Sequence, residues 1–390
     1  MPQTKLTPAQ QINTPQALDD LIQHLKTQSL VAFDTESNSM YAYQERVCLV
    51  QVSTRQADYI IDPLAVDITP LGAIMADPQI EKLFHGAEYD ITCLKRDYGF
   101  VFCNLFDTMV AARVCGFDAF GLSELIKRYI GIRLNKRHQR DNWGKRPLSE
   151  ASLRYAQMDT HYLPTLRDAL RLVLEEKGRI AEAREAFAEV CQTPAATPRQ
   201  PDPHAFWNIG VPRMLKDREL MILRELIDAR EHLAQKYDKP PHRILHNKLL
   251  VNLARRPPTE RKGLKQNLSC RQFQWFSKAL MSAIRRGQQA NRLPPRPRRH
   301  SAPDPITADR YACLQAWRKE RASKRGVESD VIMPKRALWE IAERAPHTLD
   351  DLRQIDSIGP WKFNAYGHEI LSVLAAYEGD DGHNANQTRG

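Results

Sequence analysis

Hydrophobic and polar positions in the first half of the chain follow two alternating patterns. Apolar runs at residues 30–33, 47–52, 59–61 and 82–84 predict buried strands, and the closeness of the first three suggests a meander. Thr14 and Pro15, a cap and a first-turn proline, precede helical spacing at Leu18, Leu21, Ile22 and Leu25. Further helices are predicted from residue 69, around 90–98, and at 108–114, 122–130 and 148–174. The pattern favours an α/β domain, a mixed sheet flanked by helices.

Two proline-rich segments interrupt the second half of the chain. Residues 193–204 lack apolar periodicity, and residues 293–305 alternate proline with arginine, so neither continues a helix. We therefore expect an N-terminal domain at 1–192, linkers at 193–204 and 293–305, helical modules at 205–292 and 306–378, and a disordered tail at 379–390. The modules match without a gap at an offset of about 88 residues, which pairs Leu226 with Leu314, Arg230 with Arg318 and Ile244 with Ile332. Chance similarity of two amphipathic stretches is the alternative.

Positive charge is concentrated in the first helical module. The net charge is +10, but residues 239–300 contain 16 Lys and Arg against the single acid Glu260, so this stretch carries about +15 and the rest about −5. Such segregation predicts a surface that binds nucleic-acid phosphates. The candidate contacts are Arg255, Arg256, Arg261, Lys262, Lys265 and Arg271. The interleaved rings of Phe273, Trp275 and Phe276 lie at near-helical spacing, and we expect them in the core.

The remaining composition argues against several classes of protein. The seven cysteines are scattered and never form a C-x-x-C pair, so we expect reduced core thiols and neither disulfides nor a zinc site. The apolar runs are too short to span a membrane, and no apolar stretch follows Lys5, which argues against a secretory signal. We expect a cytoplasmic location and no association with a membrane.

Acidic side chains occur where predicted elements begin or end. Asp34 and Glu36 are separated by one residue at the end of a strand, so both carboxylates face the same side of the sheet, where such a pair needs a cation. Asp90 follows another strand, and Tyr155 and Asp159 lie four residues apart on one helix face. Singly these are weak signals, because acids often end strands and a tyrosine is more often a packing residue.

The order and surroundings of the four acids resemble the DEDD exonucleases, in their tyrosine-containing branch. The three motifs are Phe33-Asp34-Thr35-Glu36, His85-Gly86-Ala87-Glu88-Tyr89-Asp90 and Tyr155-Ala156-Gln157-Met158-Asp159. The sibling branch has a histidine five residues before the last acid, where this chain has Arg154. The chain departs from its relatives at Ser37, where they often carry an aromatic residue.

Further segments narrow the resemblance to the ribonuclease D family. Asp141-Asn142-Trp143-Gly144-Lys145-Arg146-Pro147-Leu148 is similar to a D-x-W-x-x-R-P-L stretch of that family, and the repeated modules resemble its nucleic-acid-binding HRDC domains. The resemblance covers roughly residues 14–375. It implies a ribonuclease H-like α/β exonuclease domain followed by two small all-α HRDC-like domains.

The resemblance implies an enzyme that hydrolyses RNA from its 3' end and releases 5'-mononucleotides. Asp34, Glu36, Asp90 and Asp159 would hold two divalent metal ions, Mg²⁺ or Mn²⁺, and Tyr155 would orient the attacking water. His85 and Gly86 would form part of the wall around the terminal nucleotide, although a histidine that ends a strand is as often structural. The expected partners are single-stranded RNA 3' ends, such as those of tRNA precursors and other small stable RNAs. We expect no organic cofactor and a monomer.

Two other readings remain open from the sequence. A DNA exonuclease of the proofreading or repair type uses the same four acids, and nothing in the motifs recognises a 2'-hydroxyl. A non-catalytic RNA-binding protein on the same fold belongs to a different class, and the complete set of acids argues against it.

Overall fold

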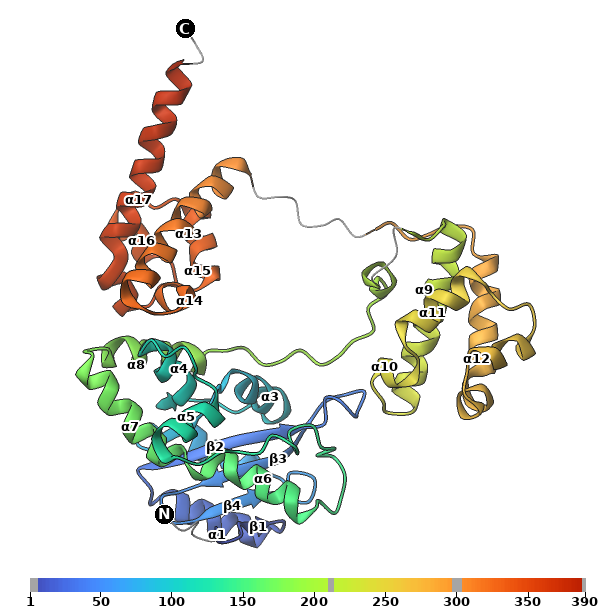
Figure 1. Cartoon of the computed structure of the whole chain (residues 1–390), viewed down its shortest axis with the longest axis horizontal. Coiled ribbons are helices and arrows are strands. Elements are labelled where there is room, and N and C mark those ends of the chain that lie inside the picture. Colours follow the sequence, from blue (N-terminus) through green and yellow to red (C-terminus); the bar gives the residue numbers. More distant parts are fainter. Residues whose placement is uncertain (1–5, 210–213, 297–303, 388–390) are drawn as a thin grey trace.

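The computed structural model describes residues 6–209, 214–296 and 304–387 (Figure 1). In the N-terminal domain, six strands form one sheet in the order β1-β4-β3-β2-β5-β6. The strands are β1 Gln10–Ile12, β2 Leu30–Ser37, β3 Val47–Ser53, β4 Asp58–Ile61, β5 Glu81–Phe84 and β6 Leu105–Asp107. Strands β2, β3 and β4 pair antiparallel, whereas β1, β5 and β6 join the sheet in parallel. The predicted meander and the mixed sheet are both confirmed.

Helices cover this sheet and complete the domain. They are α1 Pro15–Leu25, η1 Thr69–Leu71, α2 Gly72–Ala76, α3 Glu88–Tyr98, α4 Thr108–Val114, α5 Leu122–Ile130, α6 Glu150–His161, α7 Leu163–Glu176 and α8 Ile180–Cys191. The single helix expected over residues 148–174 is wrong, because the chain ends α6 at His161 and starts α7 at Leu163. The cause is Pro164, which has no N–H to donate to the preceding turn but fits the first turn of a new helix.

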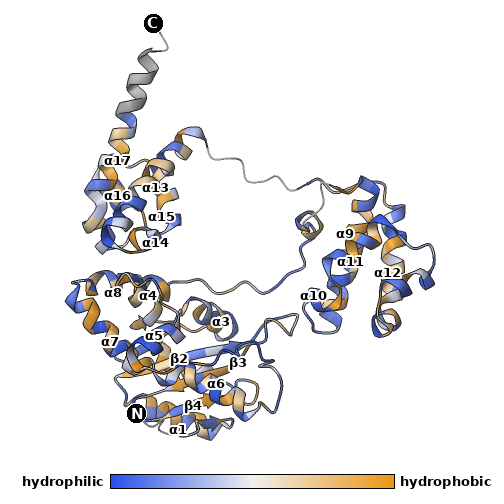
Figure 2. Cartoon of the chain, viewed as in Figure 1, coloured by the Kyte–Doolittle hydropathy of each residue, from blue (hydrophilic) through white to orange (hydrophobic). Residues whose placement is uncertain are grey.

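The two helical modules repeat one arrangement of short and long helices. The first contains η2 Ala205–Asn208, α9 Asp217–Lys236, α10 Pro241–Ile244, α11 Asn247–Arg255, η4 Arg261–Gln266 and α12 Cys270–Gln289. The second contains α13 Pro305–Arg325, α14 Ser329–Ile332, α15 Lys335–Arg344, α16 Leu349–Arg353 and α17 Pro360–Gln387. The starts of α9, α10, α11 and η4 recur 88 residues later as the starts of α13, α14, α15 and α16. Each module has its own apolar cluster, and Figure 2 shows apolar positions along α9 and α12.

The second module packs against α4 and α8 of the N-terminal domain. Arg325 pairs with Glu182, Lys362 with Glu189 and Arg113 with Asp330, at 2.5–2.6 Å. Gly116 and Gly326 lie so close that a Cβ on Gly116 would overlap the Gly326 carbonyl. The contact therefore combines ion pairs with close backbone approach.

The first module contacts the loop between β2 and β3, which extends toward α10 (Figure 1). Within that loop, the Tyr43 backbone N–H donates to Asp238 Oδ1 at 2.9 Å, and the Tyr43 hydroxyl donates to Glu231 Oε1 at 2.7 Å. The Tyr43 ring joins the apolar cluster of the first module. This tyrosine therefore fixes the first module beside the end of β2.

The described residues bear on three expectations about the rest of the chain. A disordered tail was expected at residues 379–390, but the backbone of α17 continues to Gln387. Extending a formed helix costs far less than starting one. Residues 388–390 lie outside the described part. All seven cysteines are free, but Cys270 is exposed, so not all of them are core thiols. Among the described helices, none is long and apolar enough to cross a membrane.

Candidate active site

Three carboxylates from two elements converge at one end of the sheet. Asp34 and Glu36 leave the end of β2, and Asp159 extends from α6. Carboxylate oxygens of the three residues lie within 4.8 Å of one another. They line a hollow of about 570 Å³, the active-site hollow, which also includes Tyr41, His85, Gly86, Asp90 and Tyr155. The strand alternation that predicted a shared face for Asp34 and Glu36 is thus seen in the structure.

Asp90 lies on the same hollow but is held separately by β2. Its Oδ1 atom accepts hydrogen bonds from the Thr35 backbone N–H at 3.1 Å and from the Thr35 hydroxyl at 2.5 Å. The residue is 6% exposed and sits in the first turn of α3. Three of the four predicted acids therefore form one tight group, and the fourth lies beside it with one oxygen engaged by the protein.

Burial, and after it the repulsion between the carboxylates, makes ionisation of this group unfavourable. Burial raises the pKa of Asp34 well above its ordinary range, and the carboxylates of Asp90, Asp159 and Glu36 raise it further. Burial, followed by the charges of Asp159 and Asp90, raises the pKa of Glu36 to about 9. Burial is also the largest cause that raises the pKa of Asp90 and Asp159 to about 7. Oxygen donors that repel one another at this range fit a hard divalent cation, which would restore the ionised forms.

Tyr155 is one turn before Asp159 on α6 and shares a hydrogen bond with it. Burial raises the pKa of the Tyr155 phenol above its ordinary value, and the charge of Asp159 raises it further, so the phenol keeps its proton. The ring packs 6.2 Å from that of Trp143. Because its apolar body is fixed and its hydroxyl reaches the acids, Tyr155 can hold a water molecule without acting as a metal ligand.

Helix α6 is itself anchored to the sheet by a half-buried acid, Asp58 at the start of β4. Its carboxylate accepts from Ser53 Oγ at 2.6 Å and from Gln157 Nε2 at 2.7 Å, and it pairs with His161 Nδ1 at 2.8 Å. These bonds fix the turns of α6 on either side of Asp159. Sequence reasoning missed Asp58, because an acid at the start of a strand carries no signal of its own.

His85 and Gly86 follow β5 and lie on the active-site hollow, as predicted. Thr108 donates its hydroxyl proton to the Phe84 carbonyl at 3.1 Å, so it accepts from His85 Nδ1 at 2.9 Å. Burial lowers the pKa of His85, which leaves Nε2 as an acceptor. The turn depends on Asp107, which accepts from the Gly86 and Ala87 N–H groups at 2.9 and 2.7 Å. Sequence reasoning missed Asp107; its position as the cap of α4 was the available signal.

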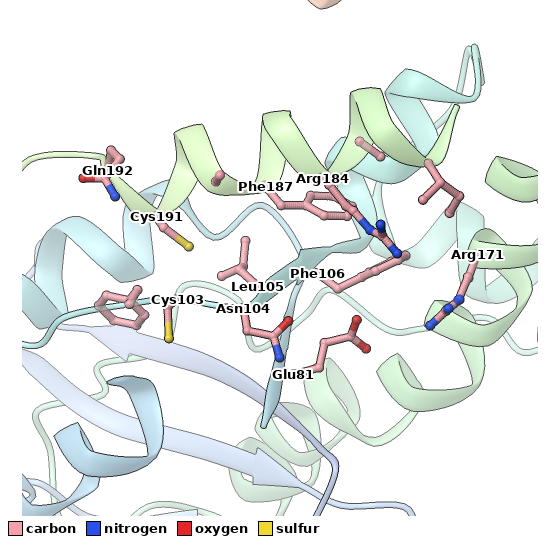
Figure 3. Close-up of a pocket in the computed structure, with 14 residues that line it drawn as sticks. Glu81, Cys103, Asn104, Leu105, Phe106, Arg171, Arg184, Phe187, Cys191 and Gln192 are labelled. Atoms are coloured by element: carbon pink, nitrogen blue, oxygen red, sulfur yellow. The ribbon is translucent and has the colours of Figure 1, made fainter. Parts of the chain in front are cut away.

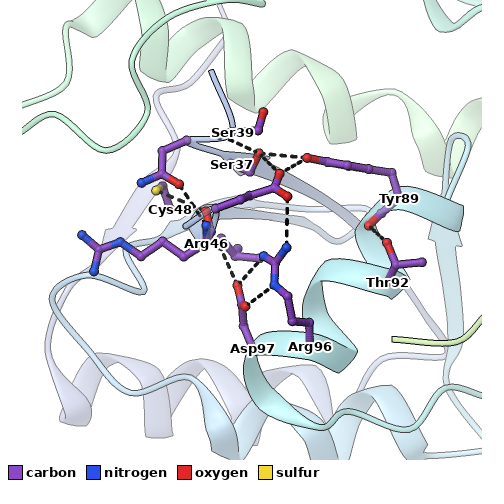
Figure 4. Close-up of polar contacts among 11 residues, drawn as sticks. Ser37, Ser39, Arg46, Cys48, Tyr89, Thr92, Arg96 and Asp97 are labelled. Carbon is purple, nitrogen blue, oxygen red and sulfur yellow. Dashed lines mark hydrogen bonds and ion pairs between the residues drawn. The ribbon is translucent and has the colours of Figure 1, made fainter. Parts of the chain in front are cut away.

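Ser37, the departure from the family pattern, lines the hollow and belongs to a polar network that Figure 4 shows. Its hydroxyl donates to Glu45 Oε1 at 2.7 Å and lies 3.1 Å from the Tyr89 hydroxyl, which also bonds to Glu45. Arg96 connects Glu45 to Asp97 at 3.0 and 2.7 Å. An aromatic ring, from Tyr89 of α3, therefore lies beside Ser37 on the wall of the hollow.

The segment at residues 141–148 borders the active-site hollow and holds the loop before α6 in place. Asp141 accepts from Ser152 Oγ at 2.6 Å, and Trp143 is buried at 1% exposure. Arg146 pairs with Asp62 at 2.6 Å and donates to the Cys48 carbonyl at 2.8 Å. This part of the motif is structural, because it ties the loop before α6 to β3 and to the end of β4.

The predicted phosphate contacts lie in the first helical module and not in the active-site hollow. Arg261 and Lys265 lie over the Phe273 ring at 5.1 and 5.5 Å, and Arg261 also donates to Ser277 Oγ at 2.8 Å. Arg255, Arg256 and Lys262 are exposed near the end of α11 and in η4. Of the interleaved rings only Phe276 is fully buried; Trp275 is 40% exposed, so its expected place in the core is wrong.

A second hollow of about 490 Å³ lies between β6, α7 and α8 (Figure 3). Cys103 and Cys191 lie toward one end of it and Arg171 and Arg184 toward the other, as Figure 3 shows. Glu81 is the one acid among its lining residues, so the hollow lacks the converging carboxylates of the first.

Comparisons with known proteins agree with this geometry. Residues 9–175 match the model of the 3'-5' exonuclease family, and residues 219–284 and 308–374 each match the HRDC domain. The chain carries a DEDD 3'-5' exonuclease domain and two HRDC domains. The domain types expected from the motifs and the repeat, and the fold class, are confirmed.

Among curated proteins, the ribonuclease D of Gluconacetobacter diazotrophicus is 34% identical over 252 residues, which are 64% of this chain and 63% of that protein. The chain therefore spans less than two thirds of the length of this relative. The catalytic core of RRP6 from Trypanosoma brucei has a TM-score of 0.63 at 25% identity, covering 73% of this chain and 80% of that chain. The RNase D of Escherichia coli, described as an exoribonuclease involved in structured RNA processing, has a TM-score of 0.64 at 23% identity, covering 95% of this chain and all of the other. The fold of the E. coli protein thus extends over nearly the whole of this chain, whereas the RRP6 core matches about three quarters of it.

Proposed function

We propose that this chain is a 3'-to-5' exoribonuclease that releases 5'-mononucleotides. The observation that carries the proposal is the convergence of Asp34, Glu36 and Asp159 within 4.8 Å, beside Tyr155, in a hollow of an exonuclease domain. Similarity to ribonuclease D supports RNA as the substrate, although the chain covers only part of that relative.

The metal sites are part of the same proposal. Asp34, Glu36, Asp90 and Asp159 would together hold two divalent ions, Mg²⁺ or Mn²⁺. Two such ions would offset phosphate charge, make a bound water acidic and stabilise the attacking and leaving oxygens. The all-oxygen donor set supports these hard cations over zinc or copper.

The other residues of the hollow have positioning roles. Tyr155 holds the attacking water by a hydrogen bond from its protonated phenol. His85 Nε2 and the backbone at Gly86 contact the terminal nucleotide, and the hydrogen bonds to Asp107 keep that wall in place. Arg255, Arg256, Arg261, Lys262, Lys265 and Arg271 contribute phosphate contacts farther along the RNA.

We further propose that the natural substrates are 3' ends of tRNA precursors and other small stable RNAs, and that the protein is a cytoplasmic monomer without an organic cofactor. These points rest on the resemblance to ribonuclease D.

The test compares wild type with Asp34→Asn on 5'-labelled single-stranded RNA and on DNA of the same sequence, with Mg²⁺, Mn²⁺ or EDTA. We expect a metal-dependent ladder that shortens from the 3' end, faster on RNA, and absent in Asp34→Asn. Preference for DNA would favour a repair exonuclease instead. Cleavage of neither polymer by the wild type would leave a non-catalytic RNA-binding protein.

A further inference from the structure

Two smaller hollows adjoin the active-site hollow through shared lining residues and extend onto the first HRDC domain. Tyr41 lines both the active-site hollow and the next one, which we call the junction hollow and which also includes Asn142 and His242. Lys239 and Arg243 line the junction hollow and also a third hollow, which includes Trp275. We call this third one the aromatic hollow. Shared lining residues therefore place the three hollows in succession from the carboxylates to the surface of α12.

The junction between the two domains is fixed by the protein itself. The guanidinium of Arg243 lies 4.0 Å from the centre of the Tyr41 ring, and the Tyr41 hydroxyl donates to the Arg140 carbonyl at 2.6 Å. Two residues farther on, Tyr43 is hydrogen-bonded to Asp238 and Glu231 of the HRDC domain. These contacts within the protein therefore fix the positions of the hollows relative to one another without a bound ligand.

The aromatic hollow contains the indole of Trp275, which is not buried in the apolar core of the module. Trp275 is 40% exposed and lies parallel to Tyr237, with ring centres 5.5 Å apart and an angle of 8° between the planes. The Arg271 guanidinium lies 4.3 Å from the Trp275 ring. Partly exposed rings beside an arginine are the features with which proteins hold bases of single-stranded nucleic acids.

Charge favours the same ligand. Lys239, Arg243 and Arg271 line these two hollows, and none of the described residues that line them is an acid. Among the residues that the structure describes, these three cations form no ion pair with a carboxylate, in contrast to Arg286 of the same module, which pairs with Glu225 at 2.7 Å. Unpaired positive charge beside rings fits a phosphate backbone with attached bases better than it fits an apolar peptide.

We propose that the RNA strand that enters the active-site hollow crosses Tyr41 and Arg243 and places an upstream base in the aromatic hollow, against the Tyr237–Trp275 pair. Lys239, Arg243 and Arg271 contact the phosphates on this path. The direction of the strand rests on the proposed 3'-to-5' activity. The base site is inferred from the geometry of the aromatic hollow and is independent of that activity.

The test measures binding of oligouridylates from two to about sixteen nucleotides, the range of single-strand site sizes, to the Asp34→Asn full chain. Affinity should increase at the length that reaches the aromatic hollow. Trp275→Leu in this background should remove that increase, weakening the longer oligomers about tenfold or more while leaving the dinucleotide unchanged. Arg271→Gln should weaken the longer oligomers and reduce the salt dependence of binding. If Trp275→Leu unfolds, the Arg271→Gln variant still tests the proposal.

The matched control is Arg285→Gln, an exposed arginine on the same helix that lines neither hollow. The proposal is overturned if Arg285→Gln weakens binding as much as Arg271→Gln, since the effect would then be general charge. It is also overturned if Trp275→Leu binds every length like its parent, in which case the exposed pair serves another partner, such as a protein. Failure of the wild type to cleave RNA would contradict the proposed function but not this site, because binding is measured in an inactive variant.

Discussion

Thr35 and Asp90, 55 residues apart in the chain, are joined by two hydrogen bonds to a single carboxylate oxygen. One comes from the backbone of β2 and the other from the side chain, so the strand that carries Asp34 and Glu36 also sets the position of the fourth acid. The relative placement of the acids therefore depends on a residue that has no chemical role of its own.

Thr35→Val should remove the hydroxyl bond while keeping the shape of the side chain. Because residues that orient metal ligands typically contribute 10–100-fold to metal affinity or activity, we expect a loss in about that range and a higher Mg²⁺ requirement. Activity titrated with Mg²⁺ measures both. Thr35→Ser keeps the hydroxyl and should stay close to wild type; equal loss in both variants would contradict the role of the bond.

Tyr155→Phe should lower kcat by about a hundredfold, because it removes the hydroxyl that positions the attacking water. The ring still packs against Trp143, so thermal stability should remain near that of the wild type. Metal affinity should also be unchanged, since the phenol is not proposed as a ligand. Calorimetric titration with Mn²⁺ beside single-turnover kinetics separates the two effects, and a kcat equal to that of wild type would exclude the proposed role.

Asp58 should make stability depend on pH in the acidic range. Burial alone would raise the pKa of this carboxyl, but hydrogen bonds from His161, Ser53 and Gln157 outweigh burial and lower it. The folded-state pKa thus lies below the unfolded value of about 4, so the ionised carboxylate stabilises the fold above that pH. The contribution is lost as the pH falls through the folded-state pKa.

Asp58→Asn should therefore lower the free energy of unfolding by about 1–3 kcal/mol at pH 7, with a smaller difference from wild type near pH 3. Denaturant unfolding at several pH values provides the measurement. Asp168→Asn removes a half-exposed partner of Arg55 and should change stability by less than about 1 kcal/mol. A deficit of Asp58→Asn that stayed constant down to pH 3 would show that its ionisation is not involved.

Arg325→Gln should release the second HRDC domain from the exonuclease domain. The carboxylate of Glu182, only 2% exposed, would be left buried without its partner, a change that typically costs about 3–5 kcal/mol. Small-angle scattering should show a larger radius of gyration. Lys324→Gln breaks a neighbouring exposed pair with Glu320 and should leave the shape unchanged. An unchanged radius in both variants would mean that the remaining contacts are sufficient.

Much of the exonuclease domain could be predicted from local pattern. Strand alternation placed Asp34 and Glu36 on one face, and helical spacing placed Tyr155 one turn from Asp159, because both periodicities are properties of the backbone. The repeat of 88 residues was visible because matching residues recur in the sequence without a gap. In contrast, β1 and β6, of three residues each, are too short to show a pattern.

Features that depend on contacts between distant segments could not be predicted in the same way. Trp275 stacks on Tyr237, the residue that follows α9, and helical spacing on α12 does not reveal this contact. The supporting acids Asp58 and Asp107 act through hydrogen bonds to residues as far as 103 positions away. Likewise, the resemblance of the two helical modules said nothing about which surface each presents to the exonuclease domain.

Both HRDC domains are fixed to the same exonuclease domain, the first through Tyr43 and the second through Glu182. The chain between Leu293 and Asp304 therefore joins two points that are already anchored, so each attachment raises the effective concentration of the other. Loss of one contact then leaves its HRDC domain tethered near its binding surface, from which it can rebind. Longer linkers would lower this effective concentration only slowly, whereas a linker too short for the span would force one of the two contacts open.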